Sequence, residues 1–445
     1  MKQGILKKAP AFILSLLVCL MVTNVYAFNA ERSVLENGLI VLHTENHNLP
    51  IVTVTLIVKA GQTREAEINA GLAHLTAELL TEGTKNRTAK AVSEEMDFIG
   101  ASLNASAGRD YTTVSLSVLK KDLEKGLDVF ADILQHPIFP DEEMKRKKDQ
   151  IKGLLQKLEE EPAFLAARAF RESVFGSYPY GRVLQGTDNS IDAIERDDLV
   201  SFHSKFFIPN NTILSVVGDI TQKELSVLIE KYFSPWERGN PPAAVPPLES
   251  SVHDAVIIKI DKDLTQANIL TGKRSIGREN PDYYPLSVMN YILGGGGFSS
   301  RLMQSIRDDM GLAYDIHSSF TAMKESGLFQ IAVQTKNESA QIVIEEICKQ
   351  VKKMRAEYIT DQELSDAKSY LTGSFKRRLD TNQKIADFLA LVEFYTLGPD
   401  YIERYPEYIN AVTKDDILRV ARKYLDLDQF VLVVVARLEQ TTLKY

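Results

Sequence analysis

The sequence predicts an α+β fold made of two homologous halves, each an antiparallel sheet covered by helices. Residues 112–118 and 328–335 alternate polar and apolar side chains, which is typical of antiparallel strands with one exposed face. Residues 145–161 and 361–378 instead carry apolar side chains at helical spacing. Long amphipathic helices beside such strands pack as a layer on the sheet.

An internal match, repeated in the same order, predicts the two halves. Residues 198–218 align without a gap with residues 416–436, and in both an acid opens an amphipathic helix that a buried-type strand follows. A second pair, 111–134 and 327–351, predicts a strand and then a helix in each half. Two matches in one order indicate a duplication.

Residues 1–27 are typical of a secretory signal peptide. Three lysines precede a short apolar run, and small residues precede the expected cleavage after Ala27. Cys348 is the one cysteine beyond this segment, so no intrachain disulfide can form and stability depends on large apolar cores. An export signal without disulfides fits the bacterial periplasm.

The proline-rich stretch ERGNPPAAVPPLESS, 237–251, is the strongest linker signal in the chain. It separates an N-terminal half, 28–236, from a C-terminal half, 252–445.

The net charge limits the possible partners. Removing the three signal-peptide lysines changes the formal net charge from −8 to −11. An acidic chain is a poor nucleic-acid binder, because phosphate contact needs clustered lysines and arginines. Beyond the signal peptide, no stretch approaches the ~18 uninterrupted apolar residues of a membrane span.

The stretch GLAHLTAELLTEGT, 71–84, carries the first candidate chemistry. His74 and Glu78 lie one helical turn apart, so their side chains share one stripe of the predicted helix. That stripe, with Glu82 one turn further on, suits a metal site, but we favour a polar stripe beside a cleft or a histidine satisfied in the core.

The frame of this stretch, G-x-A-H with G-T nine residues after the histidine, resembles the inverted zinc peptidases. This is the pitrilysin, insulinase and mitochondrial processing peptidase family, whose H-x-x-E-H motif supplies two zinc ligands and a general base. By this resemblance His74 matches the first ligand, Ala77 stands at the base position, and Glu78 stands at the second ligand.

The family's third ligand is a glutamate on a later helix. Residues 161–187 resemble the family segment that follows that helix, and counting back from Pro162 places the ligand at about Leu154. Leucine cannot bind zinc. The resemblance therefore implies a degenerate catalytic set, with no metal bound in this chain.

Residues 294–320 resemble the family's C-terminal segment, in which an arginine and a tyrosine bind substrate backbone and help to stabilise an oxyanion. Arg307 and Tyr314 match them at the family's spacing of seven. Without the resemblance they would be a surface arginine and a core tyrosine. The glycines before them fit either a tight turn or a short substrate-handling loop: Gly294, Gly295, Gly296 and Gly297.

The resemblance implies a clamshell of two halves and a division of labour between two chains. We expect the non-zinc subunit of a heterodimeric periplasmic zinc metallopeptidase, with peptide substrates, a zinc-bearing partner of the same family and zinc in that partner. The alternatives are a non-enzymatic peptide-binding or scaffold protein and, third, a self-sufficient metallopeptidase.

Overall fold

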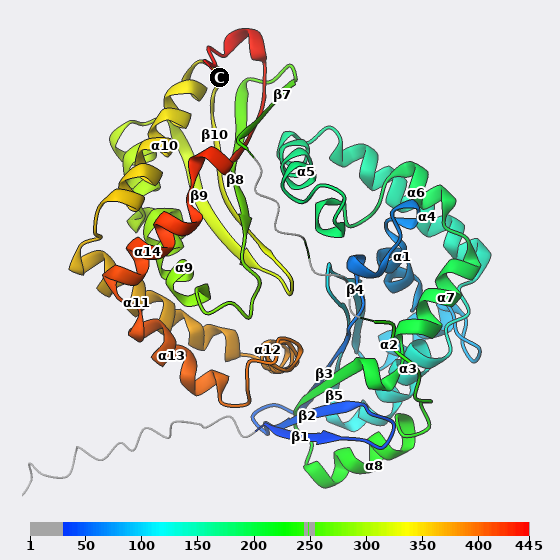
Figure 1. Cartoon of the computed structure of the whole chain (residues 1–445). Coiled ribbons are helices and arrows are strands. Elements are labelled where there is room, and N and C mark those ends of the chain that lie inside the picture. Colours follow the sequence, from blue (N-terminus) through cyan, green and yellow to red (C-terminus); the bar gives the residue numbers. More distant parts are fainter. Residues whose placement is uncertain (1–29, 244–247, 249–253, 445) are drawn as a thin grey trace, which may run out of the picture.

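The computed structural model describes residues 30–243, 248 and 254–444, which form two halves lying side by side like the shells of a clam (Figure 1). The expected signal peptide, 1–27, and part of the expected linker, 237–251, lie outside the described residues. Within the described ranges, no helix is both long and apolar enough to cross a membrane.

The N-terminal half is built on a six-stranded sheet with the order β1-β2-β6-β3-β5-β4. Central strand β3 pairs Val54 with Leu116 of β5 on one side and with Val216 of β6 on the other. The strands are β1 Glu31–Val34, β2 Ile40–Glu45, β3 Ile51–Val58, β4 Ser102–Ala107, β5 Thr112–Leu119 and β6 Thr212–Gly218.

Eight α-helices belong to the described part of this half, and most pack their apolar stripes against one another and one face of the sheet in a single core. They are α1 Leu72–Leu79, α2 Ala89–Phe98, α3 Leu123–Gln135, α4 Asp141–Leu158, α5 Pro162–Phe175, α6 Asp188–Ala193, α7 Arg196–Phe206 and α8 Gln222–Tyr232.

The C-terminal half repeats this plan on a five-stranded sheet with the order β7-β11-β8-β10-β9. Its strands are β7 Val256–Asp261, β8 Gln266–Ser275, β9 Ala313–Ala322, β10 Gly327–Lys336 and β11 Val431–Ala436. Its helices are α9 Tyr283–Asn290, α10 Ala340–Ala356, α11 Asp361–Phe375, α12 Asn382–Phe394, α13 Tyr401–Ala411 and α14 Lys414–Tyr424.

The two sheets match strand for strand once β1 is set aside. The matched segments 198–218 and 416–436 form helix α7 with strand β6 and helix α14 with strand β11. Both strands run parallel to the first strand of their repeat, β6 beside β2 and β11 beside β7, whereas all other pairs are antiparallel. The expected sheets were antiparallel throughout. Long helical connections let β6 and β11 return in the parallel direction, which hairpins cannot do.

One helix of each half packs on the sheet of the other half. Helix α5 packs on β8 and β11, and helix α12 packs on β3 and β6. Phe170 of α5 lies in an apolar cluster with Val433 of β11, while Leu389 of α12 lies in one with Ile57 of β3. The halves are therefore joined by two reciprocal apolar interfaces as well as by the linker.

Candidate substrate-binding site

The start of helix α1, where the zinc-peptidase pattern has its first glycine, depends on close packing at Gly71 and on a buried cap. Gly71 precedes the helix at φ +94°, and a Cβ there would lie 2.6 Å from the carbonyl oxygen of Gln185. The buried Glu65 carboxylate accepts hydrogen bonds from the backbone N–H of Gly71 at 3.0 Å and of Ala73 at 2.6 Å, which caps the helix start. Burial raises the pKa of Glu65 to about 7, although both bonds lower it.

The two polar residues of the α1 stripe do not form a metal site. His74 is partly buried, burial lowers its pKa, and no described residue hydrogen-bonds to its ring. Glu78 forms an ion pair with Lys147 of α4 at 3.0 Å, and Lys147 also pairs with Glu82 at 3.1 Å. The Glu78 carboxylate, which stands at the second ligand position, is therefore already paired with the ammonium group of Lys147.

Lys147 is a residue that sequence reasoning missed. It lies one turn from Ile151 and two turns from Leu155 of α4, both of which are buried in the core of the half. A lysine on the buried face of a helix needs a carboxylate partner. The four-residue spacing of Lys147 from Ile151 was therefore the sequence signal that could have identified it. Burial alone would lower the pKa of Lys147, but pairing with the two glutamates raises it.

The remaining first-half positions also lack the groups that zinc requires. Ala77 is packed in the core, and Leu154 is 42% exposed while its neighbour Leu155, on the buried face, is 6% exposed. Neither leucine carries a donor atom. Among the described residues no group of three histidine, cysteine, aspartate or glutamate side chains is arranged to hold a metal. The donor set does not fit zinc.

The glycine run 294–297 ends a π-helical turn, Tyr291–Gly295, that continues α9, and leads into the short turn Gly297–Ser299. A Cβ would lie 2.6 Å from Ser318 N at Gly294, 2.5 Å from Asn290 Nδ2 at Gly295 and 2.8 Å from Tyr291 O at Gly296. Gly297 has φ +58° and open space around it. Three of the four positions thus have close neighbours, and the short turn carries Phe298.

Arg307 and Tyr314 lie close to each other. The Arg307 guanidinium lies 4.5 Å from the ring centroid of Phe298 and 5.5 Å from that of Tyr314. No described side chain or carbonyl accepts a hydrogen bond from it, so its N–H donors are unused. The two rings are 68% and 87% exposed. No local sequence pattern indicates Phe298, because its contact with Arg307 depends on how the glycine run folds.

A β-bulge directs Tyr314 outward. Strand β9 pairs Ile316 with Val333 and Ala313 with Thr335 of β10, so Tyr314 and Asp315 together oppose Gln334. Bulges of this kind re-aim side chains beside functional sites. Tyr314 consequently lines a cleft of about 690 Å³ between α5 and the C-terminal sheet.

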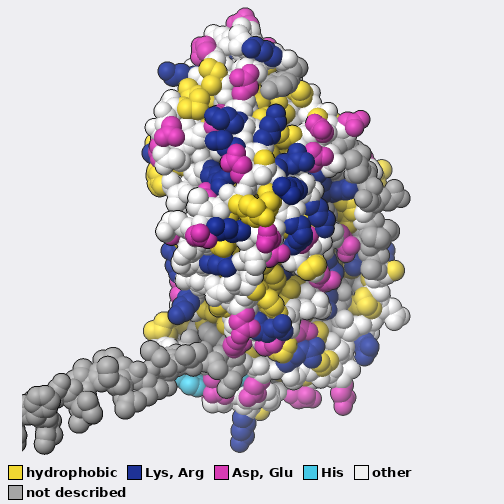
Figure 2. All heavy atoms as spheres, turned by 60° about the vertical axis from the view of Figure 1, so that its left-hand side comes forward, with side chains coloured by type: hydrophobic (Ala, Val, Ile, Leu, Met, Phe, Trp, Pro, Cys, Tyr) yellow, Lys and Arg dark blue, Asp and Glu magenta, His cyan; other side chains and the backbone are white. Residues whose placement is uncertain are grey.

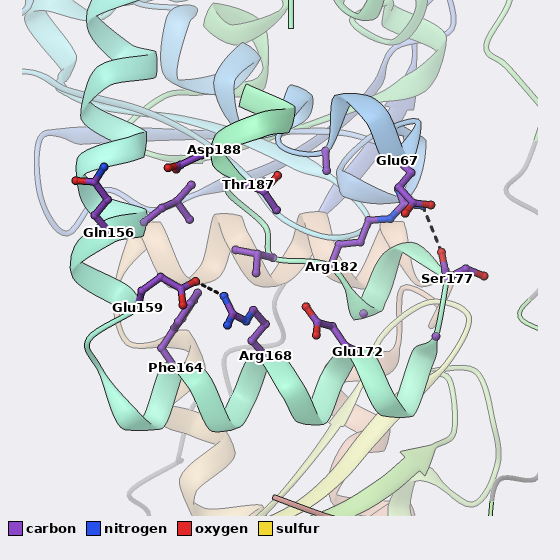
Figure 3. Close-up of a pocket in the computed structure, with 16 residues that line it drawn as sticks. Glu67, Gln156, Glu159, Phe164, Arg168, Glu172, Ser177, Arg182, Thr187 and Asp188 are labelled. Carbon is purple, nitrogen blue, oxygen red and sulfur yellow. Dashed lines mark hydrogen bonds and ion pairs between the residues drawn. The ribbon is translucent and has the colours of Figure 1, made fainter. Parts of the chain in front are cut away.

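Another cleft contains none of the predicted site residues. It has a volume of about 780 Å³ and lies inside the N-terminal half, bounded by α4, α5 and the segment before α6 (Figure 3). Arg168 there forms an ion pair with Glu159, and Arg182 donates to the carbonyl of Ser177 at 3.3 Å. Its charged groups are thus partly engaged with one another.

The outer helical face of the C-terminal half gathers lysine and arginine side chains (Figure 2). Several are paired with acids: Lys349 with Glu346 at 2.8 Å and Lys423 with Asp282 at 3.0 Å. Interspersed pairs of this kind are typical of a solvated helix surface. The site that stands out is therefore the exposed group formed by Phe298, Arg307 and Tyr314.

Two matching halves, each a helix-covered sheet, and a zinc-peptidase helix frame define the class of two-domain peptidase folds. Residues 40–188 match the family model "Insulinase (Peptidase family M16)", and residues 193–371 match "Peptidase M16 inactive domain". The chain belongs to peptidase family M16.

Relatives and solved structures agree with this membership. An "Uncharacterized zinc protease" of Rickettsia bellii is 29% identical over 401 residues, covering 89% of this chain and 95% of that protein. The "Uncharacterized zinc protease YmxG" of Bacillus subtilis is 26% identical over 358 residues, covering 80% and 86%. A peptidase M16 inactive domain from Pseudomonas fluorescens superposes with TM-score 0.86 at 28% identity, covering 92% and 98%. A Helicobacter pylori protease gives 0.85 at 22%, covering 92% and 99%, which shows the fold alone.

Proposed function

We propose that this chain is the non-zinc subunit of a heterodimeric M16 metallopeptidase that cleaves peptides in the bacterial periplasm. The observation that carries the proposal is Arg307, a guanidinium steadied by two exposed aromatic rings with its hydrogen-bond donors unused. The planar guanidinium can donate hydrogen bonds to a peptide carbonyl without first breaking a hydrogen bond to another protein group, so binding carries no such cost.

Arg307 and Tyr314 would act on the substrate by donating hydrogen bonds. A guanidinium and a phenol can both donate to a peptide carbonyl oxygen, and such bonds strengthen when the oxygen gains negative charge. The outward direction of Tyr314 at the β-bulge supports this role. The chain would thereby bind and orient the peptide.

The degenerate zinc motif of the N-terminal half is the reason for proposing a partner subunit. Ala77 stands at the base position and Glu78 is paired with Lys147, so neither of these two motif positions supplies a free base to activate water. A zinc-bearing M16 subunit would supply the metal centre, and neither chain would be active alone. The signal-like segment at residues 1–27 supports a periplasmic location for the pair.

The test begins with affinity purification of the full chain from the periplasm of its native host. We expect a second M16 chain with an intact H-x-x-E-H motif to copurify, and we expect metal analysis to find zinc in the complex and none bound by this chain alone. Isolation without such a chain would favour the peptide-binding or scaffold alternative. Stoichiometric zinc in this chain alone would overturn the proposal.

Peptide cleavage by the reconstituted complex then tests the role of Arg307. Removing one oxyanion donor lowers kcat by about 100-fold or more in other peptidases, so Arg307→Ala is expected to lower kcat/KM by about that factor. Arg307→Lys is the matched control for charge, because it keeps the cation without the planar fork, and it should recover little activity. Unchanged cleavage with Arg307→Ala refutes the role.

A further inference from the structure

The cleft that Tyr314 lines extends the candidate site under a helix of the other half. Ala163, Ala166 and Ala167 of α5 form one wall, and strands β8, β9 and β10 form the other. Its volume of about 690 Å³ falls within the range of ordinary ligand sites, about 300–1000 Å³. Alanines on the helix keep the cleft open, since larger side chains would fill it.

The sheet wall of this cleft presents carboxamides that have no partner. Gln330 and Gln334 of β10 alternate with residues buried in the core, so they share the cleft face, and Asn268 of β8 lies directly opposite Gln334. No described group hydrogen-bonds to any of these three side chains. A carboxamide both donates and accepts, which is the pattern that a peptide backbone requires of its receptor.

The charges in the cleft balance one another. His317 Nδ1 lies 2.8 Å from Asp315 Oδ2, and both line the cleft beside Tyr314. Lys336, the last residue of β10, lies at the same end of the cleft, two residues beyond the Gln334 that Tyr314 and Asp315 oppose, and its charge is opposite to that of Asp315. The balance disfavours a strongly acidic or basic ligand and leaves the carboxamides as the main recognition groups.

We infer that this cleft binds the extended, uncharged backbone of a peptide that continues past Arg307. The inference rests on the proposed function and adds a requirement for substrate length. From Gln334, which Tyr314 opposes, back to Gln330 the lining strand runs about 13 Å at about 3.3 Å per residue, so an extended peptide needs about four further residues to fill the cleft. Short peptides would reach Arg307 and Tyr314 only.

Fluorescence anisotropy of the purified full chain tests the length requirement. The probes are amidated peptides of alternating serine and leucine, three and nine residues long, each labelled with fluorescein at the N-terminus. We expect the nonapeptide to bind at least about ten-fold more tightly, equivalent to about 1.4 kcal/mol. Ala163→Phe fills the cleft from an exposed helix position and should reduce nonapeptide affinity to that of the tripeptide.

Two further variants keep the inference testable if Ala163→Phe fails to fold. Gln330→Ala removes a carboxamide at the end of the cleft away from Tyr314 and should weaken nonapeptide binding about two- to ten-fold, with tripeptide binding unchanged. Ala411→Phe, at an exposed helix position outside the cleft, is the matched control and should change neither affinity.

The outcomes separate this inference from the proposed function. If Arg307→Ala weakens both peptides while Ala163→Phe and Gln330→Ala leave nonapeptide binding intact, the inference fails and the proposed function stands. Equal losses for both peptides in the cleft variants also overturn the inference. If Arg307→Ala weakens neither peptide, the proposed function itself fails.

Discussion

Glu65 predicts a pH dependence of stability that one substitution can isolate. Its carboxyl is buried at the start of α1, and its pKa rises from 4.5 to about 7 on folding. A raised carboxyl pKa means that the folded state holds the proton more tightly than the unfolded state. Its contribution to stability is therefore fully present below pH 4.5 and is lost as the pH rises through about 7.

The magnitude follows from the shift. At about 1.4 kcal/mol per pKa unit, the contribution lost between pH 4.5 and pH 8 is on the order of 3 kcal/mol. Urea unfolding at pH 5 and pH 8 measures it as the difference between wild type and Glu65→Gln, because a glutamine does not titrate. Wild type is expected to lose more stability over this interval than the variant.

Glu67→Gln is the matched control, since the Glu67 side chain is 80% exposed and lies two residues away. It should keep the pH dependence of wild type. If Glu65→Gln also keeps that dependence, burial does not raise the pKa of Glu65 on folding.

Three further predictions concern contacts that the structure adds. Phe298→Ala removes the closer ring over Arg307 and should weaken peptide binding about two- to five-fold by anisotropy, with Phe298→Tyr as the control that keeps a ring. Lys147→Met leaves Glu78 unpaired and should lower the thermal midpoint, a loss that Glu78→Gln in the same chain partly restores; a stable single variant contradicts this account. Leu389→Ala should reduce the free energy of unfolding by about 2–5 kcal/mol in urea titrations, and a loss under 1 kcal/mol would mean that α12 is not packed on the first sheet.

The sequence predicted the fold well because its signals are local. Strand alternation and helical spacing identify faces, and the capping box of Thr413 with Asp416 marks the start of α14 directly. Helix α4 starts at Asp141, four residues before the expected 145, because acids favour the first turn of a helix and can belong to it.

The exchange of helices between the halves could not be predicted from the sequence. An apolar stripe shows that α5 and α12 are buried but does not say which sheet they cover, since either sheet offers an apolar face. The same limit applies to the candidate site. The positions of Arg307 and Tyr314 came from a motif, whereas Phe298 and Lys147 act through contacts between segments that no local pattern specifies.

The exchange of α5 and α12 has a consequence for the order in which the chain folds. The first sheet is complete in sequence at Gly218, yet one of its faces stays uncovered until α12, residues Asn382–Phe394, has been synthesised. Contacts that join such distant segments slow folding, because a large loop must close before they form. Each half therefore buries part of its sheet only when the other half is present, which couples the stability of the two halves.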